Sequence, residues 1–285
     1  MAETWEAPAK LNLSLLVKPV DSFGFHPIRS LVQAIEWCDL LTIEEAHEDH
    51  LSIVGADLPD GGDNLVWKAV SALRRAAGLS RPLLAFRLEK KIAVAAGLGG
   101  GSADAAAALR GVGRLLRVRD DAVQKVAAQV GSDVSFFLNG GTAWMGGRGE
   151  LIETMKMTDD YVVAIAVPPP ELGSAAVYRR WDEMGEPRGP ELPHRALPPS
   201  LRDLGPFRND LQPAAIDLSP DLADWQRELA AAWERPVAMS GSGPALFGFF
   251  PDMGEASDAV RAVVPGARAT TAASLRRVGV ELLEG

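Results

Sequence analysis

Cysteine is almost absent from this chain, and its scarcity limits what the protein can be. With Cys38 as the only cysteine in 285 residues, no intrachain disulfide and no cysteine-rich zinc site can form. No apolar run approaches the ~18 residues that a membrane-spanning helix needs. The opening residues M-A-E-T-W-E-A-P lack the pattern of a signal peptide. These absences fit a protein of the reducing cytoplasm.

Positive charge is also scarce. The formal net charge is −9 and no basic run occurs, which argues against binding along a nucleic-acid backbone. Any anionic ligand must therefore be held by local geometry against an unfavourable overall charge. The hydrophobic fraction of 47% and the charged fraction of 24% are typical of a soluble globular protein. The length suits one large domain or two modest ones.

The most informative stretch is Gly97–Ser102, where four glycines fall in five positions before an alanine-rich run. Glycine lacks a Cβ, so backbone N–H groups can approach a bulky anion and φ can be positive. A helix that follows would direct its N-terminal amides and positive dipole end to the same place. We expect a phosphate-binding loop. The alternative is a loop that only turns the chain before a buried helix, for which one or two glycines suffice.

The class of phosphate site stays open at this level. No lysine follows the glycines, so the loop is not a Walker A motif. It nearly matches the dinucleotide fingerprint, but Ser102 stands where Gly or Ala belongs. Lys90 and Lys91, just upstream, either meet a nucleotide or are surface residues.

Residues 11–17 alternate with a period of two, which predicts a strand. Leu11, Leu13, Leu15 and Val17 share one face. Lys10, Asn12 and Ser14 share the other, and that face is either solvated or lines a site.

Asp133 lies between a predicted helix, which Asp120 caps and Gly131 ends, and a strand-like apolar run from Val134 to Phe137. It is either a cap or turn residue or a carboxylate directed into a site. A second glycine-rich stretch, residues 240–245, separates two apolar segments. It is either a hairpin loop or a tight loop that brings backbone amides near a ligand.

The remaining pattern predicts an alternation of strands and helices. Asn64 and Gly78 have the residue types that begin and end a helix, and His47 and His50 are interpreted as part of a solvated loop. Residues 185–206 are too rich in proline for regular structure. The domain boundary is placed near Thr158, which gives domains 1–157 and 158–285. Further strands are expected at 28–43, 83–88, around Trp144, 161–167 and 268–274, and further helices at 102–116, from 209, at 222–233 and at 255–264.

Three ordered motifs resemble those of the GHMP kinases, a family that includes galactose, homoserine, mevalonate and phosphomevalonate kinases. They are P-A-K-L-N-L at 8–13, G-L-G-G-G-S-A-D-A-A at 97–106 and S-G-S-G-P-A at 240–245. Four shorter stretches add to the resemblance, which covers nearly the whole chain: G-F-H at 24–26, D-N-L at 63–65, G-S-D-V-S-F-F at 131–137 and N-D-L at 209–211.

The resemblance implies a two-domain α+β fold, with a ribosomal-S5-like N-terminal domain and a ferredoxin-like C-terminal domain. It implies a kinase that uses ATP and Mg²⁺ to phosphorylate the 2-hydroxyl of a methylerythritol bearing a cytidyl diphosphate, in non-mevalonate isoprenoid synthesis. A small-molecule substrate, no nucleic-acid or membrane partner, and a monomer or weak homodimer are expected. The rival interpretations are a GHMP kinase for another small alcohol, a non-catalytic nucleotide-binding protein and a dinucleotide oxidoreductase.

Residue roles follow from the same resemblance. Asp133 is the expected base for the substrate hydroxyl and Lys10 its partner. The ATP contacts are expected at Asn64, Lys90, Ala93, Ala96, Gly97, Leu98, Gly99, Gly100, Gly101, Ser102 and Ala103. The substrate contacts are expected at Asn12, Phe25, His26, Tyr178, Gly241 and Ser242, with Phe25 and Tyr178 enclosing the cytosine and His26 at its edge. No protein ligand for the magnesium is assigned.

The sequence also departs from the family pattern at a few positions. Phe25 and Ala93 stand where the family usually has Tyr and often has Pro, and Ser132 and Ser135 replace the common Ala and Pro.

Overall fold

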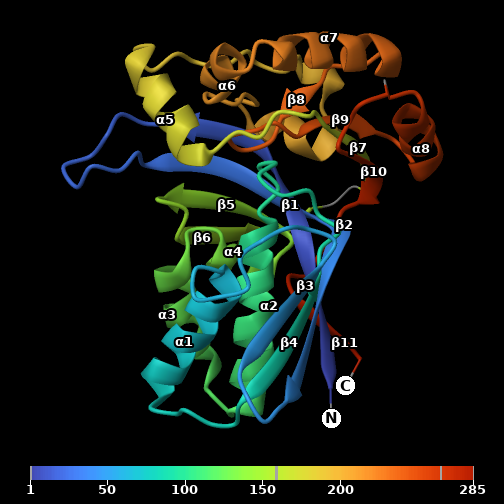
Figure 1. Ribbon diagram of the computed structural model, residues 1–285. Helices are drawn as coiled ribbons and strands as arrows, with labels where there is room; N and C mark the ends of the chain where they lie inside the picture. The colour runs from blue at the N-terminus through green and yellow to red at the C-terminus, as the bar shows by residue number, and fades with distance from the viewer. Residues whose placement is uncertain (1, 158–159, 264, 285) are drawn as a thin grey trace.

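Two β-sheets organise the molecule in the computed structural model, which describes residues 2–157, 160–263 and 265–284 (Figure 1). One sheet has seven strands and the other has four. Helices pack on both, so the α+β expectation is confirmed. The domain boundary predicted near Thr158 lies outside the described residues.

The larger sheet has the path β11-β1-β2-β4-β3, and β5 adds to β2 and carries β6. β3 and β4 are parallel, whereas β1 pairs antiparallel with both β2 and β11. The strands are β1 (Glu3–Val17), β2 (Ile28–Glu45), β3 (His50–Val54), β4 (Leu84–Glu89), β5 (Thr142–Gly147), β6 (Leu151–Met155) and β11 (Glu281–Glu284).

β1 and β2 form a long hairpin that reaches from the larger sheet to the second half of the molecule. β2 pairs with β5 through residues 28–33 and with β4 through residues 40–45. The strand predicted at 11–17 is confirmed, but it begins at Glu3. The buried Trp5, Ala7 and Ala9 extend the alternation backwards.

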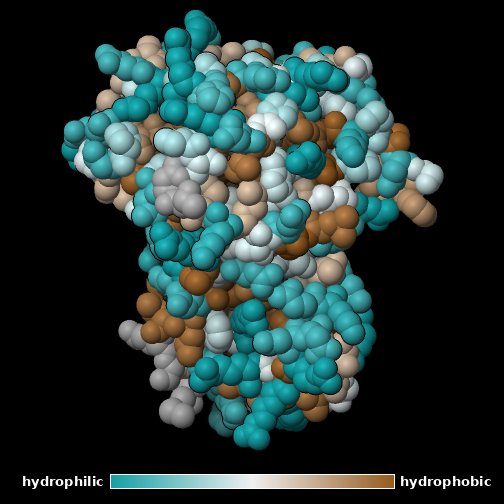
Figure 2. Space-filling model, turned by 180° about the vertical axis from the view of Figure 1, so that it is seen from behind, coloured by the Kyte–Doolittle hydropathy of each residue, from teal (hydrophilic) through white to brown (hydrophobic). Residues whose placement is uncertain are grey.

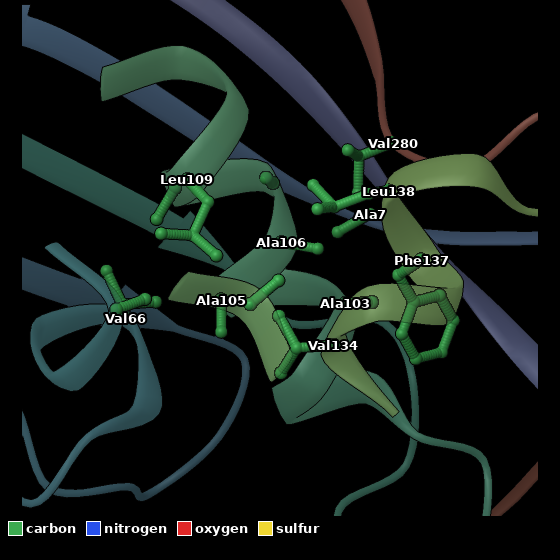
Figure 3. Close-up of a cluster of buried hydrophobic side chains, with 14 of the residues drawn as sticks. Ala7, Val66, Ala103, Ala105, Ala106, Leu109, Val134, Phe137, Leu138 and Val280 are labelled. Atoms are coloured by element: carbon green, nitrogen blue, oxygen red, sulfur yellow. The ribbon is translucent and has the colours of Figure 1, made fainter. Parts of the chain in front are cut away.

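Four helices pack on this sheet. They are α1 (Leu65–Ala77), α2 (Gly100–Leu115), α3 (Asp120–Val130) and α4 (Val134–Asn139). As predicted, the Asn64 side chain caps α1 by accepting from Val66 N, and Gly78 ends it at φ 67°. The small side chains of α2 allow close packing among α1, α4 and the sheet, and Figure 3 shows its alanines beside Val66, Val134 and Phe137.

Two local predictions in this half were wrong. Residues 134–137 form the helix α4 and not a strand, because a short apolar run fits either structure equally well. Asp120 does not cap α3. Arg119 holds the cap position, and the Asp120 carboxylate accepts from Arg110 instead.

The smaller sheet is antiparallel, with the order β10-β7-β9-β8. In Figure 1 the helices of this half lie around the sheet, with α6 and α7 above it. The elements are β7 (Val162–Val167), α5 (Ser174–Glu183), α6 (Gln212–Leu218), α7 (Asp221–Trp233), β8 (Ala238–Met239), β9 (Leu246–Phe250), α8 (Met253–Arg261) and β10 (Ala269–Ser274). Val264, where a helix was predicted to end, lies outside the described residues.

The proline-rich segment 185–206 contains two short 3₁₀ helices, so the prediction that it lacks regular structure was wrong. They are η1 (His194–Ala196) and η2 (Pro199–Leu204). Pro193 precedes the first and Pro198 the second, because proline is tolerated where a helical turn begins.

The end of the chain returns to the larger sheet, where β11 pairs with β1 through Trp5↔Leu282 and Glu6↔Glu281. The sequence pattern predicted no strand after residue 274. Figure 2 shows two lobes joined by a narrower waist, with hydrophilic residues over most of the visible face. Among the helices in the described ranges, none has the length and apolar character needed to span a membrane.

Candidate active site

A cavity of about 940 Å³ lies where β1, the glycine loop and the N-terminus of α5 meet. Most predicted site residues line it. From the predicted set these are Lys10, Asn12, Phe25, His26, Lys90, Ala93, Ala96, Gly97, Leu98, Gly99, Gly100, Gly101, Ser102, Asp133, Tyr178, Gly241 and Ser242. The volume is in the range of small-molecule sites.

The glycine loop takes a conformation that requires its glycines. Gly97 and Gly99 both have φ 75°, a region that side chains disfavour. A Cβ on Gly97 would lie 2.2 Å from the carbonyl oxygen of Ser240. Gly99 caps α2 without a side-chain hydrogen bond, and the first turn of α2 holds no acidic residue. The first turn of this helix therefore brings no carboxylate of its own to the cavity.

Hydrogen bonds from distant segments hold the loop in place. Lys10 N donates to Leu98 O at 2.9 Å, and Ala245 N donates to Ala96 O at 3.1 Å. The buried Ser240 hydroxyl donates to Gly97 O at 3.0 Å and accepts from Asn12 N at 3.1 Å. Residues 240–245 are thus both a β8–β9 hairpin loop and a support for the glycine loop. The role of Ser240 was not predicted, because a contact across 143 residues leaves no local pattern.

Lys10 and Asp133 meet at the cavity, with Lys10 Nζ 3.6 Å from Asp133 Oδ2. The lysine side chain is 6% exposed and the aspartate 32%. Asn12 Oδ1 accepts a short hydrogen bond from Lys10 Nζ, while Asn12 Nδ2 donates to Ser30 Oγ at 2.7 Å. Lys10, Asn12 and Ser14 are all buried, so this face of β1 is not solvated. A partly open carboxylate beside a fixed ammonium can accept a proton from a bound hydroxyl.

An aromatic cluster also borders the cavity, which His26 and Tyr178 line. His26 stacks on Tyr178 with ring centroids 5.6 Å apart, and Trp181 meets the His26 ring edge-on. His26 Nδ1 is 3.0 Å from Lys18 O, and Nε2 is 3.2 Å from the Asp182 carboxylate. Both partners are hydrogen-bond acceptors, and together they fix the orientation of the ring.

Tyr178 belongs to this cluster and is neutral at ordinary pH. Burial, and after it the negative charge of Asp133, raises the pKa of Tyr178 to about 12. Its hydroxyl can therefore donate a hydrogen bond to a ligand.

Phe25 is about half exposed and lies under a guanidinium. Arg148 Cζ is 3.6 Å from the centroid of the Phe25 ring, a cation–π contact. Hydrogen bonds from Phe25 N and Phe23 N shape this turn and lower the pKa of Asp21 below its usual range, the former contributing most. Arg148 lines the cavity and was not predicted, since one arginine in a glycine-rich turn carries no distinctive signal.

The N-terminus of α5 adds polar groups beside the 240–245 loop. Ser174 Oγ is 2.8 Å from Ser242 Oγ, and both residues line the cavity. Gly241, next to Ser242, has φ 58°. Small hydroxyl groups and amides at a helix start can bind an anion.

Three predicted ATP contacts have other partners or positions. Asn64 and Ala103 are not among the cavity-lining residues. Asn64 caps α1, and Ala103 is fully buried within α2. Lys90 lines the cavity, but its ammonium pairs with Asp39 and Asp104. Among the described residues, no group of three or more His, Cys, Asp or Glu side chains could hold a metal ion.

Two family models match the chain. The GHMP kinase N-terminal domain matches residues 64–141, and the GHMP kinase C-terminal domain matches residues 190–266. The first stretch lies in the half with the larger sheet, and the second lies in the half with the smaller sheet.

Curated relatives and solved structures agree with these matches. The 4-diphosphocytidyl-2-C-methyl-D-erythritol kinase of Anaeromyxobacter sp. (strain K) is 36% identical over 262 residues, which cover 90% of this chain and 83% of that protein. The protein of the same name from Synechococcus sp. (strain CC9902) is 34% identical, covering 98% and 99%.

Among solved structures, a 4-(cytidine 5'-diphospho)-2C-methyl-D-erythritol kinase superposes with a TM-score of 0.79 at 31% identity, covering 96% of this chain and 99% of that one. Homoserine kinase from Cytophaga hutchinsonii shares the fold, with a TM-score of 0.74 at 16% identity and 99% and 97% coverage. The two-domain α+β architecture, the ordered motifs and these matches together place the chain in the GHMP kinase family.

Proposed function

We propose that this chain transfers the terminal phosphoryl group of ATP to the 2-hydroxyl of 4-diphosphocytidyl-2-C-methyl-D-erythritol, in non-mevalonate isoprenoid precursor synthesis. The observation that carries the proposal is one cavity lined by the Lys10–Asp133 pair, the glycine loop and the cluster of Phe25, His26 and Tyr178. Relatives that bear this kinase name and share about a third of their residues with the chain support it.

The glycine loop and the start of α2 form the proposed seat of the triphosphate. The loop amides and the helix dipole favour phosphate there, and Ser102 lines the same wall. Asn64 and Lys90 remain predicted contacts on the adenine side. If Lys90 meets ATP, its ammonium does so while already paired with two carboxylates.

The proposed reaction moves one proton and one phosphoryl group. The Asp133 carboxylate accepts the proton of the 2-hydroxyl as that oxygen forms a bond to the terminal phosphorus of ATP. The bond from phosphorus to the bridging oxygen breaks, and ADP leaves. The nearby Lys10 ammonium, 3.6 Å from Asp133, helps to orient the carboxylate and the hydroxyl. Most of the rate enhancement then comes from positioning and charge stabilisation.

Magnesium fits this cavity as an ion that arrives with ATP. Mg²⁺ is often bound by one or two carboxylates together with substrate phosphates and water, and Ser102 and Asp133 are oxygen donors on the cavity wall. When bound, the ion would neutralise charge on the phosphate oxygens.

Substrate selection is proposed to reside in the aromatic side of the cavity. A pyrimidine is flat and stacks on rings, and polar groups at its edge discriminate because a mismatched group stays unpaired. His26 is held by partners on both ring nitrogens, so its orientation is set before the substrate binds. Arg148 and the start of α5, with Ser174 and Ser242, supply positive charge and donors suited to a diphosphate.

The test is an ADP-release assay on the purified protein with ATP and three alcohols in turn. We expect ADP formation with 4-diphosphocytidyl-2-C-methyl-D-erythritol and none above background with mevalonate or homoserine. Turnover of mevalonate or homoserine alone would replace the proposal with a GHMP kinase of different specificity. Binding of a non-hydrolysable ATP analogue without turnover of any alcohol would support a non-catalytic nucleotide-binding protein.

Three broader expectations remain predictions. They are the division into domains 1–157 and 158–285, the cytoplasmic location, and a monomer or weak homodimer. The pairing of β11 with β1 means that the C-terminal residues complete the sheet of the first domain.

A further inference from the structure

A buried charge cluster lies under the glycine loop, and the reaction proposed above does not use it. Its members are Asp39 on β2, Lys90 just after β4, and Asp104 on α2, which are 0%, 9% and 3% exposed. Lys90 Nζ donates a short hydrogen bond to Asp39 Oδ2 and another, of 2.7 Å, to Asp104 Oδ2. Three elements that are separate in sequence are thus tied together by charge.

Asp39 also holds the entry of the loop through its second oxygen. Asp39 Oδ1 accepts from Lys91 N at 2.5 Å and from Ile92 N at 2.8 Å. These are the first amides of the segment that leads to Gly97. Hydrogen bonds to a charged carboxylate are stronger than those between neutral groups, so the entry is fixed to the sheet.

The exit of the loop meets the same cluster. A Cβ on Gly100, the first residue of α2, would lie 3.2 Å from Lys90 Nζ and 3.4 Å from Asp39 Oδ2. Asp104 lies one turn further along α2 and pairs with Lys90. Both ends of the predicted ATP loop therefore contact the same buried charge cluster.

The charges of the cluster argue for positioning and against attraction of phosphate. Two carboxylates face one ammonium, so any surplus charge is negative and would repel a triphosphate. Burial raises the pKa of Asp104 to about 7, against the opposing effect of Lys90. Asp104 Oδ1 is buried and has no hydrogen-bond partner. Two of the three Lys90 ammonium donors are directed into the cluster.

We infer that Asp39 is a positioning residue for nucleotide binding: it fixes the entry of the ATP loop through two backbone amides and its exit through Lys90. The inference rests on the function proposed above, in which this loop binds ATP. Asp39 touches no ligand in this role. It sets the loop geometry on which the phosphate contacts depend, and small displacements of such contacts are costly.

The test compares Asp39→Asn with the unchanged protein in two assays. Calorimetry measures binding of a non-hydrolysable ATP analogue, and steady-state kinetics separate the KM for ATP from the KM for the alcohol. The asparagine keeps the volume and one acceptor, but it loses the charge that strengthens these hydrogen bonds. We expect the analogue Kd and the KM for ATP to rise about tenfold, with the KM for the alcohol unchanged.

Asp49→Asn is the matched control. Asp49 has a related arrangement nearer the surface, since its carboxylate accepts from Leu84 N at 2.8 Å and pairs with the Arg74 guanidinium, but Leu84 begins β4 and does not lead into the glycine loop. We expect this variant to lower the midpoint of thermal unfolding without weakening binding of the ATP analogue.

Three outcomes would overturn the inference. One is a folded Asp39→Asn protein with an analogue Kd within about twofold of the unchanged protein. The others are an equal loss of binding in Asp49→Asn, and an equal rise in both KM values. If the unchanged protein binds the analogue but phosphorylates no alcohol, the proposed function fails, and the binding comparison still decides the role of Asp39.

Discussion

The two sides of the cavity are built from different kinds of contact. The loop side consists of residues 93–103 and 240–245. Main-chain groups and buried side chains hold this side in place. Ser240 Oγ contacts Asn12 N and Gly97 O. The aromatic side consists of Phe25, His26, Arg148 and Tyr178. Ring contacts and a partly exposed His26–Asp182 pair hold this side in place.

This difference separates phosphate binding, which any phosphate-bearing ligand needs, from recognition of one particular substrate. Main-chain amides and a helix start are the same for any phosphate, so the loop side can be rigid. Side chains on a hairpin tip and on α5 can be exchanged without disturbing a sheet, so the aromatic side can set specificity. Variants on the two sides should therefore fail in different ways.

The largest effect is expected where the two sides meet, at Asp133. Asp133→Asn keeps the shape but removes the proton acceptor, so kcat should fall by roughly 10²–10⁴. The Kd of a non-hydrolysable ATP analogue, measured by calorimetry, should stay close to that of the unchanged protein. Turnover that survives intact in a correctly folded variant would remove Asp133 from its assigned role.

The next largest effect is expected on the loop side. Gly97→Ala places a Cβ 2.2 Å from Ser240 O at a positive φ, so the loop must move. We expect the KM for ATP to rise by about 10–100-fold, as misplacement of binding groups can cause, with a smaller change for the alcohol. Gly173→Ala is the control, since a Cβ there meets nothing within 4 Å. Equal effects of the two variants would contradict a rigid loop side.

A smaller and opposite pattern is expected on the aromatic side. Tyr178→Ala removes the ring on which His26 stacks, and the KM for the cytidyl alcohol should rise about tenfold, as loss of one base-stacking ring does. His26→Ala should act in the same direction. Steady-state kinetics at saturating alcohol should give an unchanged KM for ATP in both variants. If ATP binding suffers instead, the two pockets are exchanged.

The smallest effect concerns stability under the loop. The pKa of Asp104 is raised to about 7 in the folded protein, mainly by burial, above its ordinary value of 3.8. A raised folded pKa gives stability that is present at low pH and is lost as pH rises towards 7. Asp104→Asn should remove this slope, because the amide does not titrate. Urea unfolding at several pH values between 4 and 8 tests this, and an unaltered slope would assign it to other groups.

Much of the fold followed from local pattern. The cap at Asn64, the stop at Gly78 and the alternation of β1 were predicted from residue types, because capping and period-two burial are local effects. The wrong predictions were also local. The run 134–137 was too short to distinguish helix from strand, and Arg119 holds the cap expected at Asp120.

The sequence predicted most residues that line the candidate site, but it did not predict the residues that hold them in place. Lys10 and Asp133 were identified through family motifs, and the structure brings them within 3.6 Å, while their roles stay predictions. Ser240, Arg148 and Asp39 were missed as parts of the site. Each acts through a partner more than 50 residues away, or through a ring on another turn, and such pairing exists only after folding.

The Ser240 bridge also bears on how the protein folds. Asn12 belongs to β1, and its partner Ser240 follows 228 residues later in the chain. β11, which borders β1, comes later still. Contacts that are so far apart in sequence form slowly, because a long loop must close before they contribute. The cavity is therefore expected to close late in folding, with β1 among the last strands to gain all its neighbours.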